Sequence, residues 1–239
     1  MTGLGLTGCG GGQSGQPAPP PVTPPVTGKA LLLSALNKQG TISVMPLGDS
    51  ITYGATDPTG NGYRGRLWND FTVNGFAPRF AGSQSSGSDA LPDPENEGHG
   101  GYRIDQIAAG VDGWLQNTQP EIVLLMIGTN DMPGDQSSTA PDRLSALIDQ
   151  IVKDDPQGHL LVASIPPRTD AGGEFAARVD SYNAAIPGIV RAKAAAGEPV
   201  SFVDVHGALT GDDLTDGIHP TALGYAKIGD AWFEALQNL

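Results

Sequence analysis

Six apolar residues follow one another from Ile122 to Ile127 in this chain of 239 residues. A strand that is apolar at every position is typical of a parallel sheet covered by helices on both faces. Other short apolar runs lie at 42–47, 78–81, 160–165 and 200–205. The sequence therefore predicts a central parallel sheet of about five strands.

Between these runs the apolar residues follow the period of a helix. The pattern i, i+3, i+4, i+7 extends over 104–115, 144–152 and 225–239. A further helix is expected over 175–195, kinked or split at Pro187. Strands that alternate with helices indicate right-handed crossovers and one α/β domain, with ligands bound outside the carboxyl ends of the strands.

The first 28 residues are excluded from this domain, which we place at 29–239. Residues 10–28 are mostly Gly, Ser, Gln, Thr and Pro. Such a segment cannot bury enough apolar surface to order itself, so we expect a disordered tether.

Cys9 is the single cysteine, so no intramolecular disulfide can form and a zinc site built on several cysteines is excluded. Leu6-Thr7-Gly8-Cys9 resembles a bacterial lipobox, although residues 1–8 lack the basic start and the full apolar stretch of a signal peptide. We expect export from a bacterial cell, with the protein secreted or anchored to the membrane through a lipidated Cys9. The alternative is a free cysteine in a flexible tail.

The chain carries 13 basic and 26 acidic side chains, which gives a net charge of −13. A field of this sign repels the phosphates of nucleic acids and anionic lipid surfaces. We therefore expect no nucleic-acid partner, whereas a neutral substrate would be indifferent to the charge.

Three polar motifs lie where an α/β sheet places its active site. Residues 48–52 (GDSIT) end the first predicted strand, and residues 128–131 (GTND) end the buried one. Residues 216–220 (DGIHP) lie in the last loop, just before the final helix. Together they offer a serine, a histidine and carboxylates for chemistry.

Ser50 is the candidate nucleophile, because a serine hydroxyl reacts when a base takes its proton and a carboxylate orients that base. Asp216 and His219 are three residues apart, so in a turn both can point the same way. Asp216 can then accept from one imidazole nitrogen while the other faces Ser50. We expect Pro220 to be the first helical residue, which would put His219 at a helix start. A helix N-terminus disfavours an imidazolium, and the partner carboxylate would offset that.

The charge that develops on a substrate carbonyl needs hydrogen-bond donors fixed in advance. The backbone N–H of Ser50, the Asn130 amide and a glycine N–H could supply them. Residues 97–103 (EGHGGYR) offer the glycine, and we choose Gly101.

Simpler interpretations exist for the same residues. Ser50 could cap a helix, and Asn130 could be a turn residue. Asp49 could fix the serine loop by local hydrogen bonds, Arg64 could anchor a loop, and His99 could be structural. Each of these last three is alternatively a possible substrate contact.

Taken together, the motifs resemble the SGNH (GDSL-like) hydrolase superfamily. Four blocks occur in the family's order and cover nearly the whole chain beyond the tail, at 48–50, 97–103, 128–131 and 216–219. The resemblance implies a three-layer α/β/α, flavodoxin-like fold. It also implies that Ser50 attacks, that His219 is the base, and that the oxyanion donors are Ser50, Gly101 and Asn130, with no metal or other cofactor.

Finer features resemble carbohydrate esterase family three, which contains acetylxylan esterases. They are GYR at 62–64, FAGS at 80–83, and the segment 97–104, in which Gly100 stands where serine is expected. This resemblance implies a serine esterase that removes acetyl groups from xylan-like polysaccharide.

Two other functions remain open. A broad-specificity esterase or arylesterase on small acyl esters would share every catalytic residue and differ only in its pocket. A non-catalytic carbohydrate-binding protein on the same scaffold is a different class, but it has no need of the pair formed by Ser50 and His219.

Overall fold

The structure is a computed structural model that describes residues 1–3 and 41–239. The predictions of a lipidated Cys9, of a tether over 10–28 and of a domain start at residue 29 lie outside these residues.

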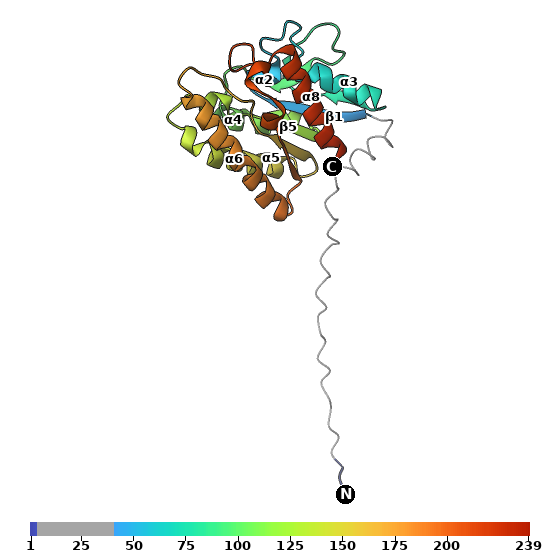
Figure 1. The fold of residues 1–239 in the computed structure, drawn as a ribbon. Coiled ribbons are helices and arrows are strands. Elements are labelled where there is room, and N and C mark those ends of the chain that lie inside the picture. Colours follow the sequence, from blue (N-terminus) through green and yellow to red (C-terminus); the bar gives the residue numbers. More distant parts are fainter. Residues whose placement is uncertain (4–40) are drawn as a thin grey trace.

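A mainly parallel sheet runs through the centre of the described residues (Figure 1). Its strands are β1 (Thr41–Gly48), β2 (Ala77–Phe80), β3 (Gln84–Ser85), β4 (Glu95–Gly98), β5 (Ile122–Met126), β6 (His159–Ala163) and β7 (Val200–Val203). The strand order is β3-β4-β1-β5-β6-β7, and β2 also pairs with β1. Within this sheet, β3 pairs antiparallel with β4 and the other pairings are parallel.

The five predicted strands are present as β1, β2, β5, β6 and β7, but the described part of the sheet has seven strands rather than about five. Strands β3 and β4 are not predicted from the sequence, because neither contains an apolar residue. Both strands lie on the side of β1 opposite β5. The sheet therefore extends further on that side than hydrophobic patterning indicates.

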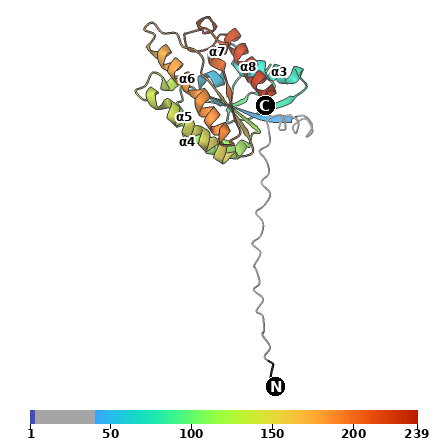
Figure 2. The same ribbon diagram turned by 60° about the horizontal axis from the view of Figure 1, so that its bottom comes forward.

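Helices cover both faces of the sheet, as Figure 2 shows. On one face α3 (Tyr63–Val73) packs against α8 (Ala222–Gln237). On the other face lie α4 (Ile104–Thr118), α5 (Ala140–Asp154) and α6 (Glu174–Ala195), each in contact with its neighbour. Short helices α2 (Ser50–Tyr53) and α7 (Val205–Ala208) follow β1 and β7. This arrangement confirms the predicted three-layer fold.

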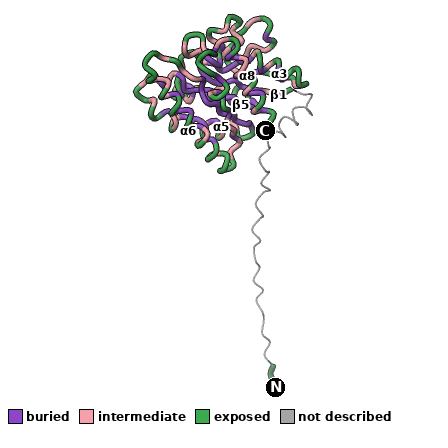
Figure 3. The backbone as a smooth tube through the Cα atoms, in the orientation of Figure 1, coloured by how far each residue is buried: buried purple, intermediate pink, exposed green. Residues whose placement is uncertain are grey.

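The core lies between the sheet and the inward faces of the helices, where Figure 3 shows the buried backbone. Most of the predicted apolar stripe is buried in both α4 and α5. All five residues of β5 are buried, which confirms the interpretation of the run at 122–127. No helix in the described ranges is both long enough and apolar enough to cross a membrane.

Helix α6 continues through Pro187 as one element, so the chain is not split there. Helix α3 was not predicted, because its sequence YRGRLWNDFTV has buried polar residues among its apolar ones, such as Arg64 and Asp70. This helix follows the serine loop and leads the chain to β2.

Candidate active site

The predicted motifs meet at neighbouring strand ends. Gly48, at the end of β1, lies beside Gly98 of β4 on one side and beside Met126 of β5 on the other. A Cβ atom at residue 48 would lie 2.2 Å from the Met126 carbonyl oxygen, so this close approach requires glycine. The loops after β4, β1 and β5 therefore emerge side by side at the edge of the sheet where α/β proteins bind ligands.

Ser50 is the first residue of α2, directly after β1. Asp49 is the N-cap residue, and its Oδ1 accepts a hydrogen bond from the Ile51 backbone N–H at 3.0 Å. The interpretation of Ser50 as the helix cap is therefore wrong, because Asp49 already fills that position. The Ser50 hydroxyl is left to interact with another part of the chain.

That partner is His219, whose Nε2 lies 2.9 Å from the Ser50 Oγ. The His219 Nδ1 lies 2.8 Å from Oδ2 of Asp216. A carboxylate can only accept a hydrogen bond, so Nδ1 carries a proton and Nε2 of the neutral ring is free to accept from Ser50. The structure thus brings the three predicted residues together in the order that a serine nucleophile requires.

Asp216 is held as a carboxylate by its own loop. Its Oδ1 accepts from the backbone N–H groups of Ile218 at 3.0 Å and His219 at 2.8 Å. Partial burial raises the pKa of Asp216, but these hydrogen bonds and the one from the His219 ring outweigh that effect and lower the pKa to about 2. The carboxyl group is therefore ionised throughout the neutral and mildly acidic range.

The predicted helix start at Pro220 is wrong. Helix α8 begins at Ala222, and Thr221 is its N-cap, with an Oγ1 that accepts from the Gly224 N–H at 3.1 Å. Pro220 instead forms an isolated β-bridge with Leu214. Because His219 lies before the cap, its orientation depends on the loop contacts with Asp216 rather than on a helix start.

The two further donors predicted for an oxyanion lie in the loops on either side of Ser50. Gly101 follows β4 with a φ of 80°, a conformation that favours glycine. Asn130 lies in a 3-10 turn after β5 (Thr129–Asp131), and its Nδ2 donates to the Tyr102 carbonyl at 2.9 Å. An amide nitrogen carries two N–H groups, so one remains for a ligand.

Asp49 and Arg64 do not fit the role of substrate contacts, because their exposed fractions are 1% and 0%. Arg64 is the loop anchor of the alternative interpretation. It donates to the carbonyl groups of Thr52, Tyr53, Gly60 and Pro94 and to the Ser86 Oγ. Asp49 holds the serine loop through Ile51, and burial raises its pKa to about 6.

His99 is the third residue with an open interpretation, and its side chain is only 11% exposed. Its Nε2 lies 2.7 Å from Oε1 of Glu97, whose side chain is fully buried. This role of Glu97 is not predicted from the sequence, although an acidic residue inside a polar motif at a strand end is a usable signal. The contacts of His99 favour a structural role over a contact with substrate.

Asp131 is another buried acid whose role was not predicted. Its Oδ2 accepts from the Ile104 backbone N–H at 3.2 Å, and its Oδ1 pairs with Arg143. Burial raises the pKa of Asp131, and Arg143 opposes this effect. Asp131 therefore ties the start of α4 to the turn that carries Asn130.

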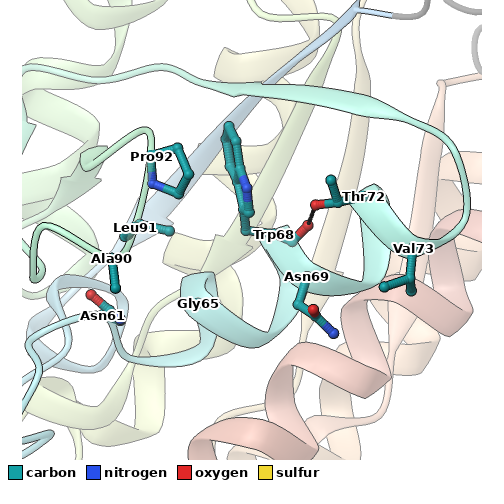
Figure 4. Close-up of a pocket in the computed structure, with 9 residues that line it drawn as sticks. All are labelled: Asn61, Gly65, Trp68, Asn69, Thr72, Val73, Ala90, Leu91 and Pro92. Atoms are coloured by element: carbon teal, nitrogen blue, oxygen red, sulfur yellow. Dashed lines mark hydrogen bonds between the residues drawn. The ribbon is translucent and has the colours of Figure 1, made fainter.

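A separate hollow of about 500 Å³ lies along α3, away from these motifs (Figure 4). Trp68 and Thr72 line it from the helix, and residues 90–92 line it from the facing loop. None of the residues predicted for the active site contributes to its lining.

Comparison with known proteins gives consistent matches. The family described as "GDSL-like Lipase/Acylhydrolase family" matches residues 47–227. A multidomain esterase of Ruminococcus flavefaciens is 32% identical over 225 residues, which are 83% of this chain and 29% of that protein. The chain thus spans less than a third of this relative's length.

Two solved structures are also similar. A family 3 carbohydrate esterase of Clostridium thermocellum has 37% sequence identity and a TM-score of 0.74, over 83% of this chain and 96% of that one. A mutant acetyl esterase with an acetate ion has 29% identity and a TM-score of 0.71, over 82% of this chain and 97% of that one.

Proposed function

This chain belongs to the GDSL-like lipase/acylhydrolase family, and we propose from that premise that it removes acetyl groups from the hydroxyls of a xylan-like polysaccharide. Its general activity is carboxylic ester hydrolysis, which follows from the family and from its esterase relatives. The observation that carries the proposed hydrolytic chemistry is the hydrogen-bonded series Ser50–His219–Asp216, with contacts of 2.9 and 2.8 Å.

In the proposed first step, the Ser50 Oγ attacks the acetyl carbonyl carbon while its proton passes to Nε2 of His219. The carbonyl π electrons move onto the oxygen, which becomes negative. This oxyanion accepts hydrogen bonds from the N–H groups of Ser50 and Gly101 and from the Asn130 amide. Asp216, which is ionised because its pKa is lowered to about 2, stabilises the imidazolium that forms.

The tetrahedral intermediate then collapses, and the bond between the carbonyl carbon and the sugar oxygen breaks. His219 returns the proton to that oxygen, which leaves as a hydroxyl group, and the acetyl group stays on Ser50. In the second half, His219 takes a proton from water, and the water oxygen attacks the acetyl carbon. The bond between the acetyl carbon and the Ser50 Oγ then breaks, His219 returns its proton to that oxygen, and acetic acid leaves and ionises to acetate.

The substrate class rests on the relatives and on charge. One similar structure is named a carbohydrate esterase and another an acetyl esterase with an acetate ion. The net charge of −13 does not oppose a neutral polysaccharide, whereas it repels polyanions. A polymeric substrate of this kind lies outside the cell, so export, with secretion or a lipid anchor at Cys9, is part of the proposal.

The test is acetate release from acetylated xylan and from p-nitrophenyl acetate by the wild type and Ser50→Ala. Ser164→Ala is the matched control, because Ser164 is a buried serine at another strand end that hydrogen-bonds Asp204 instead of a histidine ring. Release from both substrates that is lost in Ser50→Ala and kept in Ser164→Ala supports the proposal.

Other outcomes separate the alternatives. Activity on the small ester alone favours the broad-specificity esterase. Binding of xylan without hydrolysis of either ester favours the non-catalytic carbohydrate-binding protein. Full activity in Ser50→Ala refutes the assigned nucleophile.

A further inference from the structure

Glu97 and His99 form a buried pair beside the strand end that carries Ser50. Glu97 of β4 lies opposite Leu47 of β1, and its side chain has no exposed surface. A buried carboxylate is costly unless donors surround it. Oε2 accepts from the Ser83 backbone N–H at 2.7 Å, and Oε1 accepts from the Ser83 hydroxyl and from the His99 Nε2, both at 2.7 Å.

The His99 ring is held on both faces as well as at this edge. It lies between the rings of Tyr102 and Trp114, with centroids 4.7 and 4.5 Å away and interplanar angles of 16° and 17°. Trp114 belongs to α4, which is anchored in the core. The backbone N–H of His99 also donates to the Gly48 carbonyl at 2.9 Å. His99 is therefore fixed relative to both β1 and α4.

Two of the three predicted oxyanion donors, Gly101 and Asn130, depend on the segment that His99 fixes. Gly101 lies between His99 and Tyr102, and the Tyr102 N–H donates to the His99 carbonyl at 3.1 Å. The Tyr102 carbonyl in turn accepts from Nδ2 of Asn130 at 2.9 Å. The position of Tyr102 thus determines how the Asn130 amide is turned.

We propose that His99, held by Glu97, is a positioning residue that fixes the Gly101 N–H and the Asn130 amide for the developing oxyanion. This inference rests on the proposed function, because it takes those two groups as the donors. Donors that are already in place stabilise the transition state without reorganisation, and a small displacement weakens them. His99 itself transfers no proton to the substrate and needs no contact with it.

Three variants separate the contacts of this pair. His99→Phe keeps an aromatic ring for stacking but removes the N–H group. His99→Gln keeps an N–H group that can reach Glu97 but removes the stacking. Glu97→Gln keeps the shape and removes the charge.

The control is His159→Gln, because His159 is a buried histidine at the amino end of β6, with its Nε2 2.9 Å from the Ser201 Oγ. For each protein, kcat and KM for p-nitrophenyl acetate and the unfolding temperature are measured, with activity assayed well below that temperature.

We expect His99→Phe to lower kcat about 10- to 100-fold, with KM changed less than about twofold. The loss should be smaller than the fall of about 100- to 1,000-fold in kcat that deletion of an oxyanion donor causes, because the donors are displaced rather than removed. His99→Gln should restore at least half of this loss on a logarithmic scale, and Glu97→Gln should lie between His99→Phe and the wild type. The inference is overturned if kcat of His99→Phe stays within about threefold of the wild type, or falls no further than in His159→Gln.

A double-mutant cycle with Asn130→Ala tests the route, and His99→Gln replaces His99→Phe in it if the latter does not fold. Because part of the effect of His99 passes through Asn130, the loss caused by the His99 variant should be smaller in the Asn130→Ala background than in the wild type. If the fold-losses in kcat of the two single variants simply multiply in the double variant, the inference is contradicted. Activity in Ser50→Ala would refute the proposed function itself, whereas an inactive Ser50→Ala beside unimpaired His99 variants would refute only this inference.

Discussion

Strands β5 and β4 flank the strand that leads to Ser50, and both are buried, but for opposite chemical reasons. All five residues of β5, IVLLM, are apolar and buried. Strand β4 has the sequence ENEG, and its last three residues are buried as well. The two strands end beside the same residue, Gly48.

Burial of β5 is favourable by itself, because apolar surface leaves water. Burial of β4 requires a partner for every polar atom. The Asn96 side chain donates to the Ser86 hydroxyl and the Pro94 carbonyl and accepts from the Gly98 N–H, and Glu97 accepts from Ser83 and His99. Such directional bonds allow few arrangements. The apolar strand therefore stabilises the sheet, and the polar strand fixes the positions of the site.

The largest effect should come from a change in the catalytic residues that meet at these strand ends. His219→Ala removes the group that takes the Ser50 proton, so kcat for p-nitrophenyl acetate should fall about 10⁴- to 10⁶-fold. The fold should persist, because the His219 side chain contacts Ser50 and Asp216 at the surface rather than the core. A variant that keeps more than a tenth of the activity would contradict the assignment of the base.

Asn130→Ala tests whether the loop after β5 is functional rather than only structural. Loss of one oxyanion donor should lower kcat about 100- to 1,000-fold, with KM little changed. The free energy of unfolding should change by about 1 kcal/mol, the typical value of one hydrogen bond, here the one to Tyr102. If activity instead falls only in proportion to the fraction of folded protein, Asn130 is a structural turn residue and not an oxyanion donor.

Leu124→Ala is the opposite case, inside β5 itself. Leu124 is fully buried, so its truncation should lower the free energy of unfolding by about 2–5 kcal/mol. Urea denaturation measures this loss. Because the side chain does not reach the site, kcat of the folded protein at low temperature should stay within about twofold of the wild type. A large fall in kcat without a loss of stability would contradict the claim that β5 stabilises the sheet while β4 positions the site.

Asp49→Asn has the smallest expected effect, and it appears only as a pH dependence. Burial raises the pKa of Asp49 in the folded state to about 6, well above the usual value for an aspartate, so the charged form destabilises the fold. The wild type should therefore gain about 2 kcal/mol of stability relative to Asp49→Asn between about pH 7 and about pH 4. Urea denaturation at the two pH values measures this, and a constant difference would contradict the raised pKa.

The same contrast explains what the sequence could predict of the fold. Apolar burial leaves a pattern in the residues themselves, so β5, α4 and α5 were predicted from periodicity. Strand β4 leaves no such pattern, because its burial depends on partners such as Ser83 that only the fold brings near. The predicted start of α8 at Pro220 was wrong, because the capping bond of Thr221 outweighs the preference of proline for the first helical position.

The site follows the same division. Ser50, Asp216 and His219 could be named in advance, because each comes with a local motif, and the structure brings them together. The buried state of Arg64 and the stack of His99 with Trp114 could not be predicted. They depend on how α3 and α4 are placed against the strand-end loops, which no local pattern encodes.

The central claim is that Ser50 is an activated nucleophile, and covalent labelling tests it most directly. The protein is incubated with diisopropyl fluorophosphate, which transfers a phosphoryl group to an activated serine with loss of fluoride, and the labelled peptide is identified by mass spectrometry. We predict one label per chain on Ser50, no label in Ser50→Ala, and slow labelling in His219→Ala. A label on Ser164 or any other serine, or none in an enzyme that still hydrolyses p-nitrophenyl acetate, would contradict it.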